Sequence, residues 1–143
     1  MKGGRTASAL VIAVALASLL SACVGAPAPA PAPGPVHGLP DGVVPNPDIP
    51  AEVPNDATDR LDVILSTCEA TADGWMAGGT VLNPGEAEAT YEISIFFTTG
   101  SGTVIEYGTG RTVVGGGATA DWTVSVDFVA PPETTCVVRG VAA

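Results

Sequence analysis

Apolar and polar residues alternate with a period of two through most of the C-terminal half of the chain. Between Ala120 and Phe128 every second residue is apolar, and the residues between them are aspartate, threonine or serine. The same alternation runs from Tyr91 to Phe97, except that Phe96 stands where a polar residue is expected. This period is typical of strands with one buried face. Both segments are therefore predicted strands, and Phe96 either packs beneath another layer, which we favour, or marks an exposed apolar patch.

Five more strands are expected over Leu61–Ala70, Trp75–Leu82, Thr103–Tyr107, Arg111–Val114 and Thr134–Val141. Turn-forming residues separate the segments at 73–74, 83–85, 100–102, 115–117 and 131–132. Gly115–Gly117 is interpreted as a hairpin turn and not a phosphate loop, because no Lys-Ser/Thr pair follows it. Seven short strands at this spacing predict an all-β fold, a small antiparallel immunoglobulin-like β-sandwich over residues 59–143.

The N-terminus has a different pattern. Lys2 and Arg5 precede the apolar run Ala7–Leu20, which leads directly into Leu20-Ser-Ala-Cys23. At about 14 residues the run is shorter than the roughly 20 that a spanning helix needs. The arrangement resembles the signal peptide and lipobox of bacterial lipoproteins. The resemblance implies cleavage after residue 22, lipidation of Cys23, and attachment of the chain to the extracytoplasmic face of the cell membrane. A plain secretory signal or a short membrane anchor is the alternative.

Residues 26–54 hold ten of the thirteen prolines, and their start reads as Ala-Pro repeats. Proline fixes its own φ and biases the preceding residue toward extended conformations. The segment 23–58 is therefore expected to be a disordered, semi-rigid linker without a core, which lifts the domain off the membrane. A ligand for a proline-recognising partner, or a wall-binding tract, is the alternative.

Two cysteines remain once Cys23 is assigned to the lipid anchor. Cys68 lies near the start of the expected domain and Cys136 near its end. An even pair in an exported chain is most simply a disulfide. Here it would join the first strand to the last. A pair of free or redox-active thiols is the alternative, although no C-x-x-C spacing supports it.

The charge balance limits the class of partner. After residue 22 the chain has three arginines, no lysine and 15 acidic residues, a formal net charge of −12. Such a surface repels nucleic acid phosphates and anionic lipid headgroups. No nucleic acid partner is expected.

Catalytic and metal chemistry have little support. The single histidine, His37, lies in the proline-rich segment, where it would be poorly positioned as a general base. Carboxylate-only catalysis remains open to the acids on the predicted strands and their turns, namely Glu69, Asp73, Glu92, Glu106, Asp121 and Asp127. A second acidic group is scattered over the linker and the domain entry and matches no calcium loop, at Asp41, Asp48, Glu52, Asp56, Asp59 and Asp62. We therefore expect no enzyme activity, no cofactor and no metal site.

The two tryptophans are candidates for sugar-stacking platforms. Trp122 falls on the apolar face of its strand and is expected in the core. Trp75 follows a turn, and the sequence does not decide whether its ring is buried in the core or exposed for sugar stacking. An exposed Trp75 beside carboxylates would favour ligand binding, and burial of Trp75 would weaken it.

The order of strands and turns also resembles a known domain. The segments that carry the likeness are Gly79–Asn83, Tyr91–Phe97, Gly102–Ile105, Ala118–Trp122 and Cys136–Arg139. Together they are similar to the FxLYD-type immunoglobulin-like domain of exported bacterial proteins, over about residues 65–142. Phe97 matches the first residue of that motif, while Thr98 and Thr99 replace its aromatic residue and aspartate. The resemblance implies an immunoglobulin-like fold without catalytic residues.

Taken together, these features predict a membrane-anchored lipoprotein with one small interaction module. Its partners would be the membrane, through the lipid, and another protein of the cell envelope. The loops at Gly100–Gly102 and Gly115–Gly117 are expected contact surfaces. A lipoprotein that binds a small ligand, a glycan or a metal is the alternative.

Overall fold

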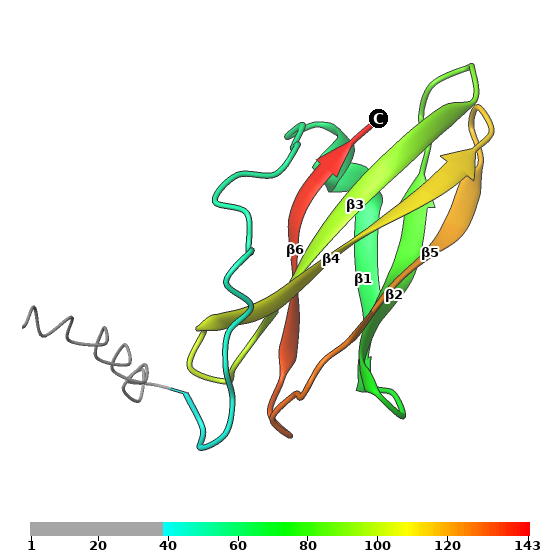
Figure 1. Cartoon of the computed structure of the whole chain (residues 1–143). Helices are drawn as coiled ribbons and strands as arrows, with labels where there is room; N and C mark the ends of the chain where they lie inside the picture. Colours follow the sequence, from blue (N-terminus) through cyan, green and yellow to red (C-terminus); the bar gives the residue numbers. More distant parts are fainter. Residues whose placement is uncertain (1–38) are drawn as a thin grey trace, which may run out of the picture. The chain divides into compact units, whose positions relative to one another are not determined.

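A computed structural model describes residues 39–143 (Figure 1). The predicted signal peptide, Cys23 and His37 lie outside the described residues. Within them, no helix is long and apolar enough to cross a membrane.

Six antiparallel strands form two sheets of three strands each, and a single turn of 3-10 helix precedes them. The first sheet has the strand order β1-β2-β5 and the second β4-β3-β6 (Figure 1). The elements are η1 (Asp59–Asp62), β1 (Val63–Ala70), β2 (Gly74–Leu82), β3 (Ala89–Thr98), β4 (Val104–Val114), β5 (Thr119–Asp127) and β6 (Thr135–Ala142). The predicted all-β sandwich class is confirmed.

The structure has six strands where the sequence predicts seven, because β4 is continuous through Gly108-Thr-Gly110. These glycines do not break the strand: they let β4 approach β5 of the other sheet. A Cβ at Gly108 would lie 2.5 Å from Val126 Cγ2, and one at Gly110 would lie 2.8 Å from the Thr123 carbonyl oxygen. The two segments expected as separate strands, 103–107 and 111–114, are therefore one.

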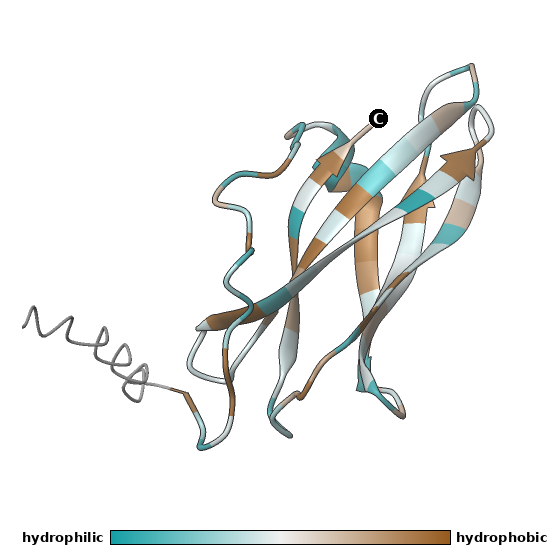
Figure 2. Cartoon of the chain, viewed as in Figure 1, coloured by the Kyte–Doolittle hydropathy of each residue, from teal (hydrophilic) through white to brown (hydrophobic). Residues whose placement is uncertain are grey.

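The core lies between the two sheets and is built from the apolar positions of the alternating pattern (Figure 2). Trp122 is 4 % exposed, as predicted, and its indole N–H donates to the Thr80 carbonyl oxygen at 3.1 Å. Phe97 is fully buried and its ring centroid lies 5.4 Å from that of Phe128. Burial of these large side chains supplies most of the stabilisation, at about 25 cal/mol per Å² of apolar surface.

The second half of the proline-rich segment packs against the sandwich. We call residues 39–56 the strap. Its Asn46 N–H donates to the Ile105 carbonyl oxygen at the outer edge of β4 at 2.9 Å, and its Asp56 N–H donates to the Val141 carbonyl oxygen of β6 at 2.6 Å. Leu39 and Val43 pack against the core. The part of the linker that the structure describes therefore has packing partners, unlike the free spacer that its proline content predicts.

The strap also covers part of the outer face of the β4-β3-β6 sheet. Gly140 is buried on that face, and a Cβ there would lie 2.6 Å from Val53 Cγ2 and closer still to the Pro54 carbonyl oxygen. Phe96 points to the same face but is only 8 % exposed, with the Arg139 guanidinium 5.9 Å from its ring centroid. The aromatic residue that breaks the alternation is thus buried, which confirms the packing interpretation.

Gly140→Ala is expected to lower the free energy of unfolding by about 1–3 kcal/mol, because the added methyl group displaces the strap from β6. Urea unfolding followed by tryptophan fluorescence measures the change. The matched control is Gly115→Ala, whose Cβ would have no neighbour nearer than 3.9 Å. That change should stay within about 0.5 kcal/mol. Equal losses of unfolding free energy from the two substitutions would show that the contact between the strap and β6 does not stabilise the fold.

Candidate functional site

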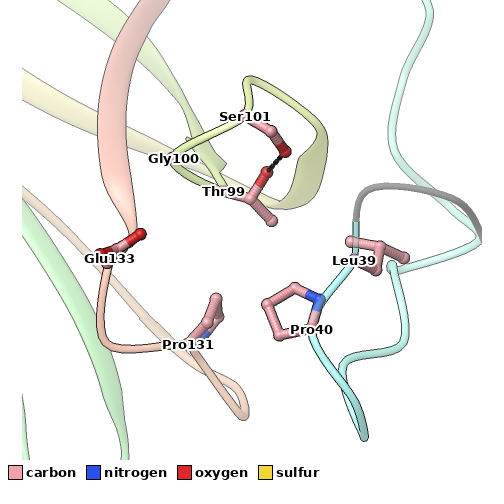
Figure 3. Close-up of a pocket in the computed structure, with 7 residues that line it drawn as sticks. All are labelled: Leu39, Pro40, Thr99, Gly100, Ser101, Pro131 and Glu133. Carbon is pink, nitrogen blue, oxygen red and sulfur yellow. Dashed lines mark hydrogen bonds between the residues drawn. The ribbon is translucent and has the colours of Figure 1, made fainter.

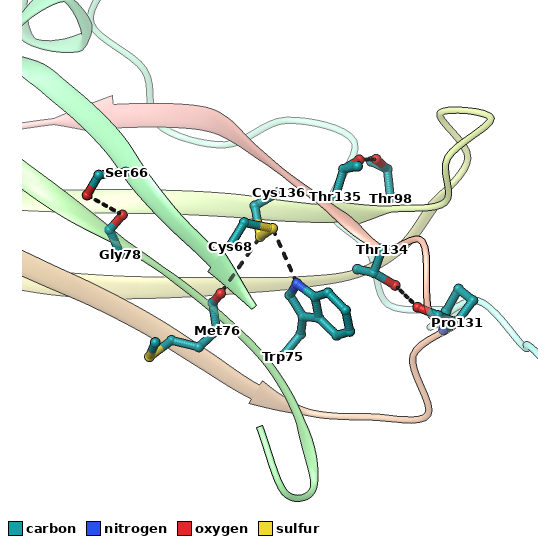
Figure 4. Close-up of a disulfide and its surroundings, with 10 residues drawn as sticks. All are labelled: Ser66, Cys68, Trp75, Met76, Gly78, Thr98, Pro131, Thr134, Thr135 and Cys136. Carbon is teal, nitrogen blue, oxygen red and sulfur yellow. Dashed lines mark hydrogen bonds between the residues drawn. A yellow bond between two sulfur atoms is a disulfide. The ribbon is translucent and has the colours of Figure 1, made fainter. Parts of the chain in front are cut away.

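The predicted disulfide is present and joins β1 to β6. Cys68 and Cys136 are bonded with a Cα–Cα distance of 5.8 Å across a sequence separation of 68 residues (Figure 4). The indole N–H of Trp75 donates to Cys68 Sγ at 3.2 Å. The bridge therefore closes one side of the sandwich and orients the neighbouring tryptophan.

Trp75 is 8 % exposed, so it is not a flat platform on the surface. This burial weakens the sugar-stacking interpretation, which required an exposed ring. Its edge nevertheless lines a hollow of about 340 Å³ between the β1–β2 turn and the loop after β5. We call this the Trp75–Phe128 hollow. Its other lining residues are mostly small or apolar: Ala70, Thr71, Ala72, Asp73, Gly74, Val129 and Ala130.

Hydrogen bonds hold the two walls of this hollow together. The Phe128 N–H donates to the Asp73 carbonyl oxygen at 3.1 Å, which ties the loop to the turn. Within the turn, the Gly74 N–H donates to Thr71 Oγ1 at 3.0 Å. In the loop, both the N–H and the hydroxyl of Thr134 donate to the Pro131 carbonyl oxygen, at 3.1 Å and 2.7 Å (Figure 4). The hollow is therefore preformed.

A second hollow of about 280 Å³ lies at the same end of the sandwich (Figure 3). The start of the strap contributes Leu39 and Pro40, and the β3–β4 turn contributes Thr99 and Gly100. Glu133 supplies its carboxylate. We call this end, made of the β1–β2 turn, the β3–β4 turn and the β5–β6 loop, the loop end. It includes Gly100–Gly102, one of the two predicted contact loops.

The other predicted contact loop, Gly115–Gly117, lies at the opposite end of the sandwich, between β4 and β5. It is a tight turn, with Gly117 at φ 67° and the Ala118 N–H bonded to the Gly115 carbonyl oxygen at 3.1 Å. It joins strands of different sheets, however, so it is not the hairpin turn that the sequence predicts. The Gly117 N–H also donates to the Gly85 carbonyl oxygen at 2.9 Å. The structure therefore does not bring the two predicted loops together.

A third hollow, of about 330 Å³, lies over the middle of the β1-β2-β5 sheet. Gly78 leaves a gap between neighbouring side chains, and the walls carry hydroxyl groups. Its lining residues are Ser66, Thr67, Met76, Gly78, Gly79, Thr80, Asp121, Trp122 and Thr123. Its exposed lining is more polar than apolar, unlike that of the two hollows at the loop end, so it offers less apolar surface to a ligand.

The candidate catalytic carboxylates are not gathered in any of these hollows. Glu92 forms an ion pair with Arg111, and Glu106 accepts a hydrogen bond from Asn46 Nδ2 at 2.6 Å. Each hollow is lined by a single carboxylate: Glu133, Asp121 or Asp73. Glycosidase-type chemistry needs two acids across one cleft. Over residues 39–143, moreover, no three His, Cys, Asp or Glu side chains could hold a metal ion.

Among the described residues, the loop end carries four exposed carboxylates and no basic residue. Glu69, Asp73, Asp127 and Glu133 lie at or beside the loop end, and all are exposed. Each of the three arginines is engaged elsewhere. The exposed Arg111 forms an ion pair with Glu92 at 2.5 Å. Arg60 donates to the Val138 carbonyl oxygen, and the Arg139 guanidinium lies over the Phe96 ring. The loop end therefore has a negative surface without a cation from the described chain.

Two groups have clearly shifted pKa values, and both lie near η1. Backbone N–H groups of Thr58 and Asp59 hold the pKa of Asp56 below its ordinary value. Burial raises the pKa of the Tyr91 hydroxyl, and the negative charges of Asp59 and Asp62 add to the rise. Neither group lines a hollow, so these shifts concern stability.

Sequence reasoning missed Phe128, Val129 and Ala130 as parts of a site. Phe128 ends the alternating segment, and Pro131-Pro132 marks a turn directly after it. No local signal shows that the β1–β2 turn meets this loop. Comparisons with protein-family models, curated proteins and solved structures find no match to this chain.

Replacing both bridged cysteines (Cys68→Ala with Cys136→Ala) is expected to lower the free energy of unfolding by about 4 kcal/mol. The reason is the lost constraint on the unfolded chain, here a loop closed across 68 residues. Urea unfolding under oxidising conditions measures it, and the wild-type chain with a reductant is the control. A loss below about 1 kcal/mol would contradict this role of the bridge.

Stability is expected to fall as pH rises above about 10, because the unfolded chain then ionises Tyr91 while the folded chain, with its raised pKa, retains the proton. Tyr91→Phe should remove that part of the slope, as measured by urea unfolding at several alkaline pH values. Tyr107→Phe is the control, because Tyr107 pairs with Phe96 on the opposite face of the sheet. An unchanged slope in Tyr91→Phe would contradict the assignment.

Proposed function

We propose that this chain is an extracytoplasmic lipoprotein, anchored in the membrane through Cys23, whose immunoglobulin-like module binds another protein of the cell envelope. The anchor is supported by the apolar run that ends in Leu-Ser-Ala-Cys. Two or three acyl chains on one cysteine hold a protein firmly at a membrane, whereas one chain binds only marginally. The FxLYD-type likeness belongs to this proposal and rests on strand order and turns.

The interaction role is supported mainly by the surface of the loop end. It presents two preformed hollows, of about 340 and 280 Å³, which adjoin in sequence at Ala130-Pro131. Val129, which lines the larger hollow, is 81 % exposed. An exposed apolar residue at the rim of a rigid hollow is typical of a contact surface. Hydrogen-bonded loops also lower the ordering cost of binding.

The anchor is tested by metabolic labelling with an alkyne-tagged fatty acid. Cys23→Ser should lose the label and leave the membrane fraction. The double Cys68→Ser, Cys136→Ser variant is the matched control, because it retains only Cys23 and should keep the label. Labelling of Cys23→Ser equal to wild type would rule out this anchor.

The interaction role is tested by placing a photo-crosslinking amino acid at Val129 in the full chain on living cells. A discrete envelope protein should be captured there. Val113 is the matched control, because it is also an exposed valine, 56 % accessible, and lies near the opposite end of the sandwich. The same set of products from both positions, or none from Val129, would count against an interaction module.

A further inference from the structure

The Trp75–Phe128 hollow joins an apolar floor to a negative rim, and these two properties specify a partner. We propose that the hollow takes one apolar side chain from a cationic polypeptide segment, with lysine or arginine residues on either side of that anchor. This inference rests on the proposed interaction role and adds the chemistry of its partner.

The apolar part of the argument is the floor and its rim. Trp75 and the half-buried Phe128 contribute aromatic carbon to the lining, and the neighbouring side chains of Ala70 and Ala72 are small. Val129 remains 81 % exposed at the edge. A side chain that enters the hollow would remove this apolar surface from water, which favours binding.

The charged part of the argument is the set of carboxylates beside the hollow. Asp73 lines it directly. Asp127 pairs in register with Gly74, and Glu69 precedes Ala70, so both are next to lining residues. All three are exposed. Asp73 at the hollow, together with these two carboxylates at the same end of the sandwich, attracts a positively charged segment.

The described chain cannot neutralise these carboxylates itself. Residues 39–143 contain no lysine, and their three arginines lie on the β6 carbonyl, on Glu92 and on the Phe96 ring. The counter-charge has to come from solvent ions or from a partner. The same net charge repels nucleic acid and anionic lipid, which leaves a basic polypeptide as the macromolecular class that fits.

The test uses the full chain and three fluorescein-labelled synthetic peptides of seven residues. The first has one central phenylalanine between lysines, the second replaces that phenylalanine with alanine, and the third replaces the lysines with glutamates. Fluorescence anisotropy should show binding of the first peptide only, weakening as salt is raised. Equal binding of the first and third peptides, or no binding of the first, would overturn the proposal.

The binding position is tested with variants that leave the core intact. Val129→Ser should weaken binding of the first peptide roughly tenfold, since burial of an aliphatic side chain is lost. Asp73→Asn with Asp127→Asn should weaken it and flatten its salt dependence. The controls are exposed residues away from the loop end: Val113→Ser, and Glu86→Gln with Glu88→Gln. Controls that weaken binding as much as the loop-end variants would overturn the assignment to this hollow.

The two proposals fail in different ways. If photo-crosslinking at Val129 captures no protein on cells, the interaction role fails. If a protein is captured there but its cross-linked segment is acidic, or the charge variants capture it equally well, the interaction role stands and the cationic segment is wrong.

Discussion

A sheet of three strands has one central strand and two edges, so two such sheets expose four rows of backbone N–H and C=O groups. Unpaired edges invite pairing with other chains, and buried ones leave polar groups unsatisfied. In this protein β1 and β6 are held side by side by the Cys68–Cys136 bridge. On the other side, β4 lies against β5 through Gly108 and Gly110. The bridge and this close approach thus join the two sheets on both sides of the core, whose burial supplies most of the stabilisation.

The strap completes this closure on β4 and β6. Five of its residues are prolines, at positions 40, 45, 47, 50 and 54, which have no N–H to donate, so it cannot add a regular strand. Its backbone donors to the sandwich are instead Asn46 at the β4 edge and Asp56 at the β6 edge. Proline still favours the extended backbone that crosses a sheet face. The same residues that give a spacer its stiffness thus allow its second half to cover the sandwich.

Closing the sides leaves the ends of the sandwich available for contact. At the loop end, two turns and one loop are fixed by their own hydrogen bonds and enclose hollows that the core does not fill. The arginines lie elsewhere, in contacts with Val138, Glu92 and Phe96, so this end keeps its negative charge. Rigid apolar hollows and an unbalanced charge are what the interaction proposal requires.

The sequence alone determined the class of fold, the strands with clear alternation and the cysteine pair. Tyr91–Phe97 and Ala120–Asp127 lie in strands because a period of two is a local property of the pleated backbone. The same rule placed Trp122 in the core. It could not decide Trp75, since that residue follows a turn and its exposure depends on a loop more than 50 residues further on.

Only the tertiary structure decided what the glycines and the prolines do. Gly108 and Gly110 are residues expected at a break between strands, but their missing side chains allow a close approach by β5, which belongs to the other sheet. The covering of Gly140 likewise depends on Val53 and Pro54, which composition assigns to a spacer. The candidate site has the same origin, because its walls come from the β1–β2 turn and the loop after β5. Alternation shows which face of a strand is buried. It does not show which other segment covers that face, because long-range packing determines that segment.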